Sequence, residues 1–166
     1  FQKTEGLTQP GTHNWFKGRE QGVVLYLHKQ DYNKAYEIFD NAKKNKRFQH
    51  LAPTDIEIWK ILEAHLQLLR AMGKIQVSTA GEKRFKLRPN KFLNDIPHFS
   101  KDKRGLNIPV LIVHAIMLLQ NKRYDEAYDR MLALDKYATR HLKAGEDTFR
   151  SYCFIKALLC IPAVDY

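Results

Sequence analysis

The sequence has few of the features that mark secreted, membrane-spanning or metal-binding proteins. It holds two cysteines, and its longest apolar run, from Ile108 to Leu119, covers 12 residues, whereas a membrane span needs about 20. No signal peptide is visible at the start of the chain. We therefore expect a cytoplasmic protein with no membrane partner. The chain begins with Phe1 rather than Met, which leaves open that it is a piece of a longer protein.

The two cysteines, Cys153 and Cys160, are seven residues apart in an apolar stretch. On one helix they are about 10.5 Å apart along the axis, too far for a disulfide. We expect both thiols to be buried as small hydrophobic groups in a reducing compartment. No Cys-x-x-Cys or paired His spacing indicates a metal site. His65 and His114 fall in apolar runs, where a hydrogen-bonded core histidine is the expectation.

Motifs of the common catalytic and nucleotide-binding sites are also missing. The sequence has no G-x-S-x-G, G-x-x-x-x-G-K-[ST], G-x-G-x-x-G or H-E-x-x-H pattern. The acids Asp125, Glu126 and Asp129 are expected on the solvated face of a helix, beside basic neighbours. We therefore expect a non-enzymatic protein with no catalytic residues, no metal and no cofactor.

The most informative feature of the sequence is an internal repeat. Residues 23–39 align without gaps on residues 115–131, at an offset of 92. In each copy an apolar helix meets a polar break, and an amphipathic helix follows whose apolar residues form one stripe of a 3.6-residue helix. The stripe residues are Tyr32, Ala35, Tyr36, Phe39 and Ala42 in the first copy, and Tyr124, Ala127, Tyr128, Met131 and Leu134 in the second. We expect the small alanines to let the preceding helix cross closely, with the aromatic residues filling the gap on either side.

At these residues the chain resembles the tetratricopeptide repeat, a helix-turn-helix unit. The second helix of that unit carries an aromatic residue and then an alanine three residues later. The matching residues are Tyr32, Ala35, Phe39 and Ala42, and then Tyr124 and Ala127, with Met131 and Leu134 in place of the later Phe and Ala. The Trp and Leu-Gly of the family's first helix are missing, and the offset differs from the usual spacing of about 34 residues. The resemblance implies stacked helical hairpins.

The remaining pattern predicts an all-α fold. Helices are expected over residues 14–28, 32–47, 54–73, 108–121, 124–142 and 147–160. Residues 75–87 alternate instead around a turn-like segment, which predicts a small β-hairpin, and a helical turn is expected near residues 91–95. We therefore predict a single domain of stacked antiparallel helical hairpins, an α-solenoid with units at about 14–47, 54–104 and 106–160. The segments 91–95, 100–107 and 147–150 also resemble the C-terminal part of uncharacterised bacterial helical-repeat proteins, which implies no function.

Two of the expected helices are apolar nearly all round. In the first, only His114 interrupts residues 110–119, which predicts a central, buried helix. In the second, Phe149–Ile161, only three residues are polar, and no later helix follows to cover it. Either it inserts between earlier helices, or a partner, further chain or a second copy covers it. Stacked hairpins expose an extended surface, so we expect a protein–protein interaction module that binds a protein or peptide or associates with itself.

Positive charge is distributed unevenly along the chain. The net charge is +10, and +6 of it falls within residues 74–104. If this segment is a hairpin, its alternating basic residues form a row that tracks a phosphate backbone or an acidic partner; the alternative is a merely solvated face. The candidate anion-binding residues are Lys83, Arg84, Lys86, Arg88, Lys91, Lys101, Lys103 and Arg104. A nucleic-acid-binding protein is therefore the alternative function.

A second basic run, Lys43, Lys44, Lys46 and Arg47, lies at the end of a predicted helix. Cations at a helix C-terminus offset the helix dipole, which is the simpler explanation of this run. The alternative is that it adds to the nucleic-acid surface of residues 74–104.

Overall fold

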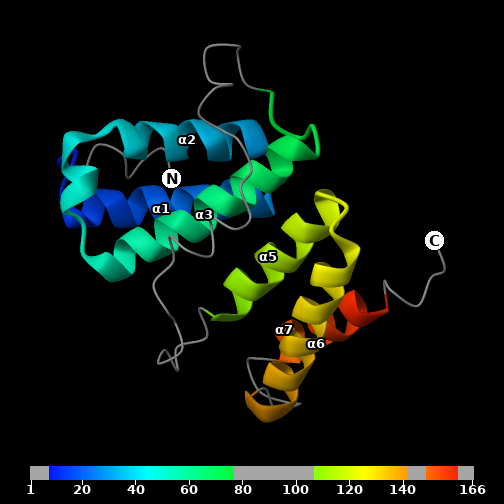
Figure 1. Cartoon of the computed structure of the whole chain (residues 1–166). Helices are drawn as coiled ribbons and strands as arrows, with labels where there is room; N and C mark the ends of the chain where they lie inside the picture. Colours follow the sequence, from blue (N-terminus) through cyan, green and yellow to red (C-terminus); the bar gives the residue numbers. More distant parts are fainter. Residues whose placement is uncertain (1–7, 77–106, 142–148, 161–166) are drawn as a thin grey trace. The chain divides into compact units, whose positions relative to one another are not determined.

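The computed structural model describes residues 8–76, 107–141 and 149–160, and the elements in these ranges are all helical (Figure 1). They are α1 (His13–His28), α2 (Tyr32–Lys44), the 3₁₀ helix η1 (Lys46–His50), α3 (Pro53–Ala71), α5 (Asn107–Gln120), α6 (Tyr124–His141) and α7 (Phe149–Leu159). The prediction of an all-α protein is confirmed over these ranges. The predicted β-hairpin lies outside the described residues except for Ile75 and Gln76, and the predicted turn near 91–95 lies wholly outside them.

The chain divides into two compact units, Phe1–Leu87 and Arg88–Tyr166. The first unit contains α1, α2, η1 and α3, and the second contains α5, α6 and α7. In the described residues each unit therefore has a helical hairpin followed by a third α-helix. The three stacked units expected from the sequence stay a prediction.

The two hairpin turns have the same backbone geometry. Gln30 and Lys122, which are 92 residues apart, are the two described non-glycine residues with positive φ, at 60° and 58°. In the first turn the Asp31 N–H donates to the Tyr26 carbonyl at 3.0 Å, and in the second the Arg123 N–H donates to the Leu118 carbonyl at 3.0 Å. This six-to-one bond across a left-handed residue is the Schellman helix ending. The repeat in the sequence therefore corresponds to a repeated local structure.

Side-chain caps fix the helix ends in the first unit. Thr12 and Asp31 accept backbone N–H groups at the starts of α1 and α2, from Trp15 at 3.3 Å and from Lys34 at 3.1 Å. Helix α2 ends at Lys44, earlier than the predicted residue 47, because Asn45 has an extended backbone (φ −68°, ψ 130°). Its Oδ1 accepts the next free N–H, from Arg47 at 2.9 Å, and η1 begins there.

The core of the first unit joins its three α-helices. Its buried apolar residues are Trp15, Phe16, Val23, Ala35, Ile38, Phe39, Ala42, Trp59, Leu62, Leu66 and Ile75. Trp59 lies at the centre, with its ring centroid 5.7 Å from that of Phe39 and 5.6 Å from that of Phe48. Tyr32 and Tyr36 are partly buried and pack against this cluster, as the repeat pattern predicts.

The core of the second unit uses smaller side chains. Its buried residues are Ile108, Ala115, Leu118, Ala127, Met131, Leu134, Ala138, Ile155 and Leu158. Ala127, like its equivalent Ala35, has no exposed surface, which agrees with the predicted close approach of the preceding helix. Helix α5 has buried residues from Ile108 to Leu118, and its predicted burial is confirmed.

One ion pair at equivalent positions ties the third helix to the second in each unit. Lys43 Nζ lies 3.0 Å from Glu63 Oε2, between α2 and α3. Lys156 Nζ lies 2.6 Å from Asp135 Oδ1, between α7 and α6. Asp135 is 92 residues after Lys43, with the opposite charge. Both units therefore place the third helix against the second at the same level.

Candidate functional site

The tyrosine pair that opens α6 does not pack as its equivalent in α2 does. Tyr124 is 46% exposed and Tyr128 is 47% exposed, and neither belongs to the core of the second unit. They are therefore less buried than expected for side chains that fill the gap beside the preceding helix. Leu132, one turn further, is also exposed, at 37%. Since the three residues are spaced by four, they form one apolar row along the outside of α6.

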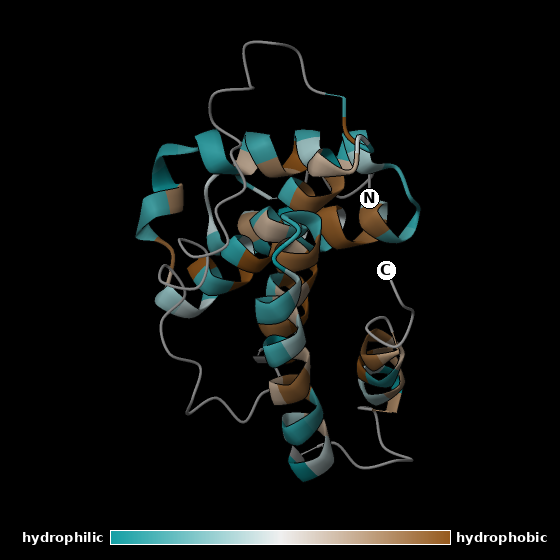
Figure 2. Cartoon of the chain, turned by 45° about the vertical axis from the view of Figure 1, so that its right-hand side comes forward, coloured by the Kyte–Doolittle hydropathy of each residue, from teal (hydrophilic) through white to brown (hydrophobic). Residues whose placement is uncertain are grey.

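Helix α7 carries a second exposed apolar face. Ile155 and Leu158 are buried against the core, whereas Phe149 is 49% exposed and Phe154 44% exposed. Cys153 and Cys160 are both free and exposed, so the prediction that the thiols are buried is wrong. The physical reason is that, among the described helices of this unit, α6 makes the main contacts with α7, and a helix packed mainly on one side leaves its other side exposed. Brown residues recur along α7 in Figure 2.

The two apolar faces adjoin along the ion pair between α6 and α7. Residues 149, 153, 156 and 160 are spaced by four, three and four, so Lys156 shares one side of α7 with the exposed Phe149 and both cysteines. On α6, residues 124, 128 and 135 likewise share one side. Because Lys156 contacts Asp135, these two sides meet. We call the resulting area the α6–α7 apolar surface; it comprises Tyr124, Tyr128, Leu132, Phe149, Cys153 and Cys160.

An acidic row borders this surface. Asp125 and Asp129 each follow a surface tyrosine by one residue, which places them about 100° further around α6. Both are exposed, and no ion pair to either is found within the described parts of the chain. Glu126 differs, because Arg123 donates to it at 2.6 Å and this hydrogen bond lowers the pKa of its carboxyl. The predicted solvated acidic face is confirmed, and it lies beside apolar residues.

The first unit contains a polar cluster that the sequence did not predict. Lys17 Nζ lies 2.9 Å from Glu20 Oε2 and 2.9 Å from Asp55 Oδ1, and both carboxylates belong to buried residues. These contacts raise the pKa of Lys17, the hydrogen bond to Asp55 most of all. His13 Nδ1 lies 3.6 Å from the other oxygen of Asp55. The i,i+3 spacing of Lys17 and Glu20 is visible in the sequence, but the approach of Asp55 from α3 is not.

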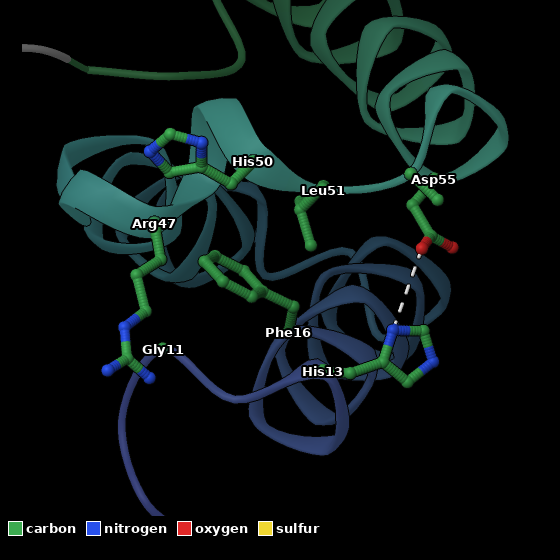
Figure 3. A pocket seen from close by; sticks show the side chains of 8 residues that line it. Gly11, His13, Phe16, Arg47, His50, Leu51 and Asp55 are labelled. Atoms are coloured by element: carbon green, nitrogen blue, oxygen red, sulfur yellow. Dashed lines mark ion pairs between the residues drawn. The ribbon is translucent and has the colours of Figure 1, made fainter.

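A hollow of about 420 Å³ lies next to this cluster (Figure 3). Its walls come from the start of α1, η1 and the start of α3, and the lining residues are Gly11, His13, Phe16, Arg47, His50, Leu51, Ala52 and Asp55. In the view of Figure 3, the guanidinium of Arg47 and the imidazole of His13 lie on opposite sides of Phe16. The guanidinium of Arg47 therefore lies apart from the His13–Asp55 pair, whereas a built ligand site has polar groups that converge on one point.

The basic run at the end of α2 is largely engaged in contacts within the unit. Lys43 pairs with Glu63 and lies 5.0 Å from the ring centroid of Phe48. Lys44 pairs with Asp40 at 2.5 Å. Both lysines lie in the last turn of α2, where the simpler explanation placed them. Of the four basic residues in this run, Lys46 and Arg47 are therefore the two that the proposed extension of the nucleic-acid surface would use.

The main candidate anion-binding residues lie outside the described residues. These are Lys83, Arg84, Lys86, Arg88, Lys91, Lys101, Lys103 and Arg104. Their role in binding nucleic acid or an acidic partner stays a prediction.

The two core histidines differ. His65 Nδ1 is 2.9 Å from the Ile61 carbonyl oxygen, as predicted, and burial lowers its pKa. His114 is buried, but within the described ranges neither ring nitrogen has a hydrogen-bond partner, so that prediction is wrong. Burial, with Arg130 and Arg123 nearby, lowers the pKa of His114 to about 4, against a smaller opposite effect of Glu126.

Among the described residues, no three His, Cys, Asp or Glu side chains are grouped as ligands of a metal ion. No helix there has the length and apolarity that crossing a bilayer requires.

Comparison of the chain with protein-family models, with curated proteins and with solved structures finds no match. The function has to be inferred from the residues and the geometry of the chain itself.

Proposed function

We propose that this chain is a non-enzymatic protein–protein interaction module of helical-repeat type, and that it binds its partner through the α6–α7 apolar surface. The observation that carries the proposal is the exposure of that surface. Four of the seven large hydrophobic side chains that are exposed in the described residues belong to it: Tyr124, Tyr128, Leu132 and Phe149. Contiguous apolar area of this kind on a folded protein marks an interaction site.

The repeated hairpin supports the helical-repeat part of the proposal. The same Schellman turn, the same buried alanine and a cross-helix ion pair at equivalent positions occur in both units. Proteins built by stacking such hairpins bury each unit against the next and use the remaining surface for binding. The likeness of both second helices to the tetratricopeptide repeat agrees with this kind of architecture.

Two exposed leucines allow a matched test. Leu132, on the proposed surface, is 37% exposed, and Leu25, on α1 of the first unit, is 38% exposed. A photo-crosslinking amino acid is placed at either position in the full chain, in the cells that make the protein. We expect one discrete protein adduct from position 132, its loss when Tyr128→Asp is added, and no adduct from position 25. The purified adduct partner should then bind the chain with a defined stoichiometry in calorimetry.

The result that contradicts the proposal is equal labelling from both positions, or no adduct from position 132. Nucleic-acid binding by the basic segment 74–104 is measured in parallel, by anisotropy of labelled RNA and DNA at about 50 and 200 mM salt. A complex that weakens by about 10³ to 10⁵ between these salts makes six to ten phosphate contacts. Such a complex, together with no adduct from position 132, would replace the interaction module by the alternative function.

A further inference from the structure

The first unit shows what covers the equivalent tyrosines when they are packed. Two contacts show how the chain runs after the middle of α3. Glu63 pairs with Lys43 near the end of α2. Thirteen residues later, the Gln76 N–H donates to Asn33 Oδ1 near the start of α2, at 3.0 Å. Ile75 is buried on the way. The second half of α3 and the residues after it therefore run antiparallel to α2 from the level of Lys43 to that of Asn33, and Tyr32 and Tyr36 pack against the same core cluster as Ile75.

In the second unit the described part of the third helix stops before this point. Helix α7 ends at Leu159, three residues beyond the Lys156 that pairs with Asp135. Tyr128 and Tyr124 lie seven and eleven residues before Asp135, which is about 10 and 16 Å along α6. The described residues thus leave an apolar row about two to three turns long, at the level where the first unit has the end of α3 and residues 72–76.

The carboxylates next to this row favour a bound helix of positive charge. Asp125 and Asp129 are exposed, lie parallel to the row, and have no ion pair to another described residue. The first turns of α6 thus present apolar side chains edged by two carboxylates. A helix seated on the row gains two ion pairs if it carries Lys or Arg beside its apolar stripe, and it meets like charge if it carries Asp or Glu there.

We propose that the α6–α7 apolar surface binds a basic amphipathic helix from a partner protein. The partner helix places aliphatic side chains on Tyr124, Tyr128 and Leu132 and basic side chains against Asp125 and Asp129. It takes the position that the second half of α3 occupies in the first unit. This inference rests on the proposed function and adds the chemical class of the partner.

The test uses designed peptides with the full chain. One helix-stabilised, fluorescein-labelled peptide of about 15 residues has leucines at helical spacing and a flanking row of lysines. A second has glutamates in place of these lysines, and a third has the composition of the first in scrambled order. At about 50 mM salt we expect the lysine peptide to bind about fivefold tighter than the glutamate peptide, by anisotropy. The scrambled peptide should bind at least tenfold more weakly than the lysine peptide.

Variants of exposed residues identify the contact. Leu132→Asp should weaken binding of the lysine peptide at least tenfold, and the matched Leu25→Asp should leave it unchanged. The double variant Asp125→Lys/Asp129→Lys should reverse the preference and select the glutamate peptide. Circular dichroism checks that each variant keeps its helix content.

Each failure has its own meaning. Equal binding of both peptides, or a preference that the double variant does not reverse, would overturn the inference of a basic partner. If neither peptide binds while position 132 still gives a discrete adduct, the inference fails and the proposed function stands; if the adduct is absent too, both fail. A dimer of the chain that Leu132→Asp dissociates, seen by sedimentation, would put a second copy in the place of the partner helix.

Discussion

Tyr32 and Tyr36 pack against the core of the first unit, whereas Tyr124 and Tyr128, at the equivalent positions of the second, remain about half exposed. The hairpins that carry the two pairs have the same turn and the same buried alanine. In the described residues the third α-helix of the first unit, α3, has 19 residues and that of the second, α7, has 11. The same local stripe is packed in one unit and half exposed in the other, so its burial depends on tertiary contacts and not on the stripe itself.

Truncating the buried side chains at two equivalent core positions should lower the stability of the chain most. Phe39 is 2% exposed and Met131 is 1% exposed. We expect Phe39→Ala to cost about 3–5 kcal/mol and Met131→Ala about 2–5 kcal/mol of unfolding free energy. Because the two core clusters share no residue, each variant should lose hydrogen-exchange protection in its own unit. Equal loss of protection in both units after either change would show that they unfold as one.

The next effect is a pH dependence in the second unit. His114 stands where the first unit has Gly22, and its pKa of about 4 in the folded chain lies below the ordinary 6.5. Between these values the unfolded chain binds the proton more readily than the folded chain does. The stability that the neutral, buried His114 contributes is therefore complete above pH 6.5 and is lost as pH falls toward 4. At pH 5 the loss is about 2 kcal/mol. Urea unfolding at pH 7 and 5 should show this loss in the parent chain and much less of it in His114→Leu. The same loss in both would contradict the assignment.

A smaller effect is expected from the polar cluster of the first unit, which has no equivalent described in the second. Lys17→Met leaves the carboxylates of Glu20 and Asp55 without their shared cation. Since the Lys17 side chain is 36% exposed, solvent screens part of the loss, and we expect a cost of about 1–2 kcal/mol. The pKa of Lys17 is raised above 10.5. The stability that its ion pairs contribute is therefore present below pH 10.5 and is lost as pH rises through the raised pKa. The control Lys44→Met, beside the half-buried Asp40, should cost less than about 1 kcal/mol in the same denaturation measurement.

The smallest effect tests whether the two turns are equivalent. Gln30 and Lys122 have positive φ, a conformation that costs a residue with a Cβ more than it costs glycine. Gln30→Gly and Lys122→Gly should each stabilise the chain by about 0.5–1 kcal/mol in thermal unfolding, whereas alanine at either site should bring no such gain. A gain at one turn without the other would break the equivalence.

The positions of the helices were predictable from the sequence, with ends correct to within a few residues. The periodic stripes of α2 and α6 mark those helices, and the polar breaks before Tyr32 and Tyr124 mark the turns. The early end of α2 was missed, because Asn45 ends one helix and caps the next within two residues. The candidate site was predicted in part. The apolar character of α7 indicated a surface in need of cover, but Tyr124 and Tyr128 on α6 were predicted to fill the gap beside the preceding helix, and Leu132 was not part of the predicted stripe.

The helices and the repeated turn follow from the local sequence, because both depend on contacts between residues at most five positions apart. Intrahelical hydrogen bonds, the caps at Thr12 and Asp31 and the left-handed residue of each Schellman ending are of this kind. Which apolar residues are buried depends on tertiary packing. Tyr36 and Tyr128 have the same local pattern, and Cys153 lies in an apolar run, yet their exposure is set by which helix packs on them and how far it extends. That information lies in contacts between residues far apart in the chain, and a local pattern does not contain it.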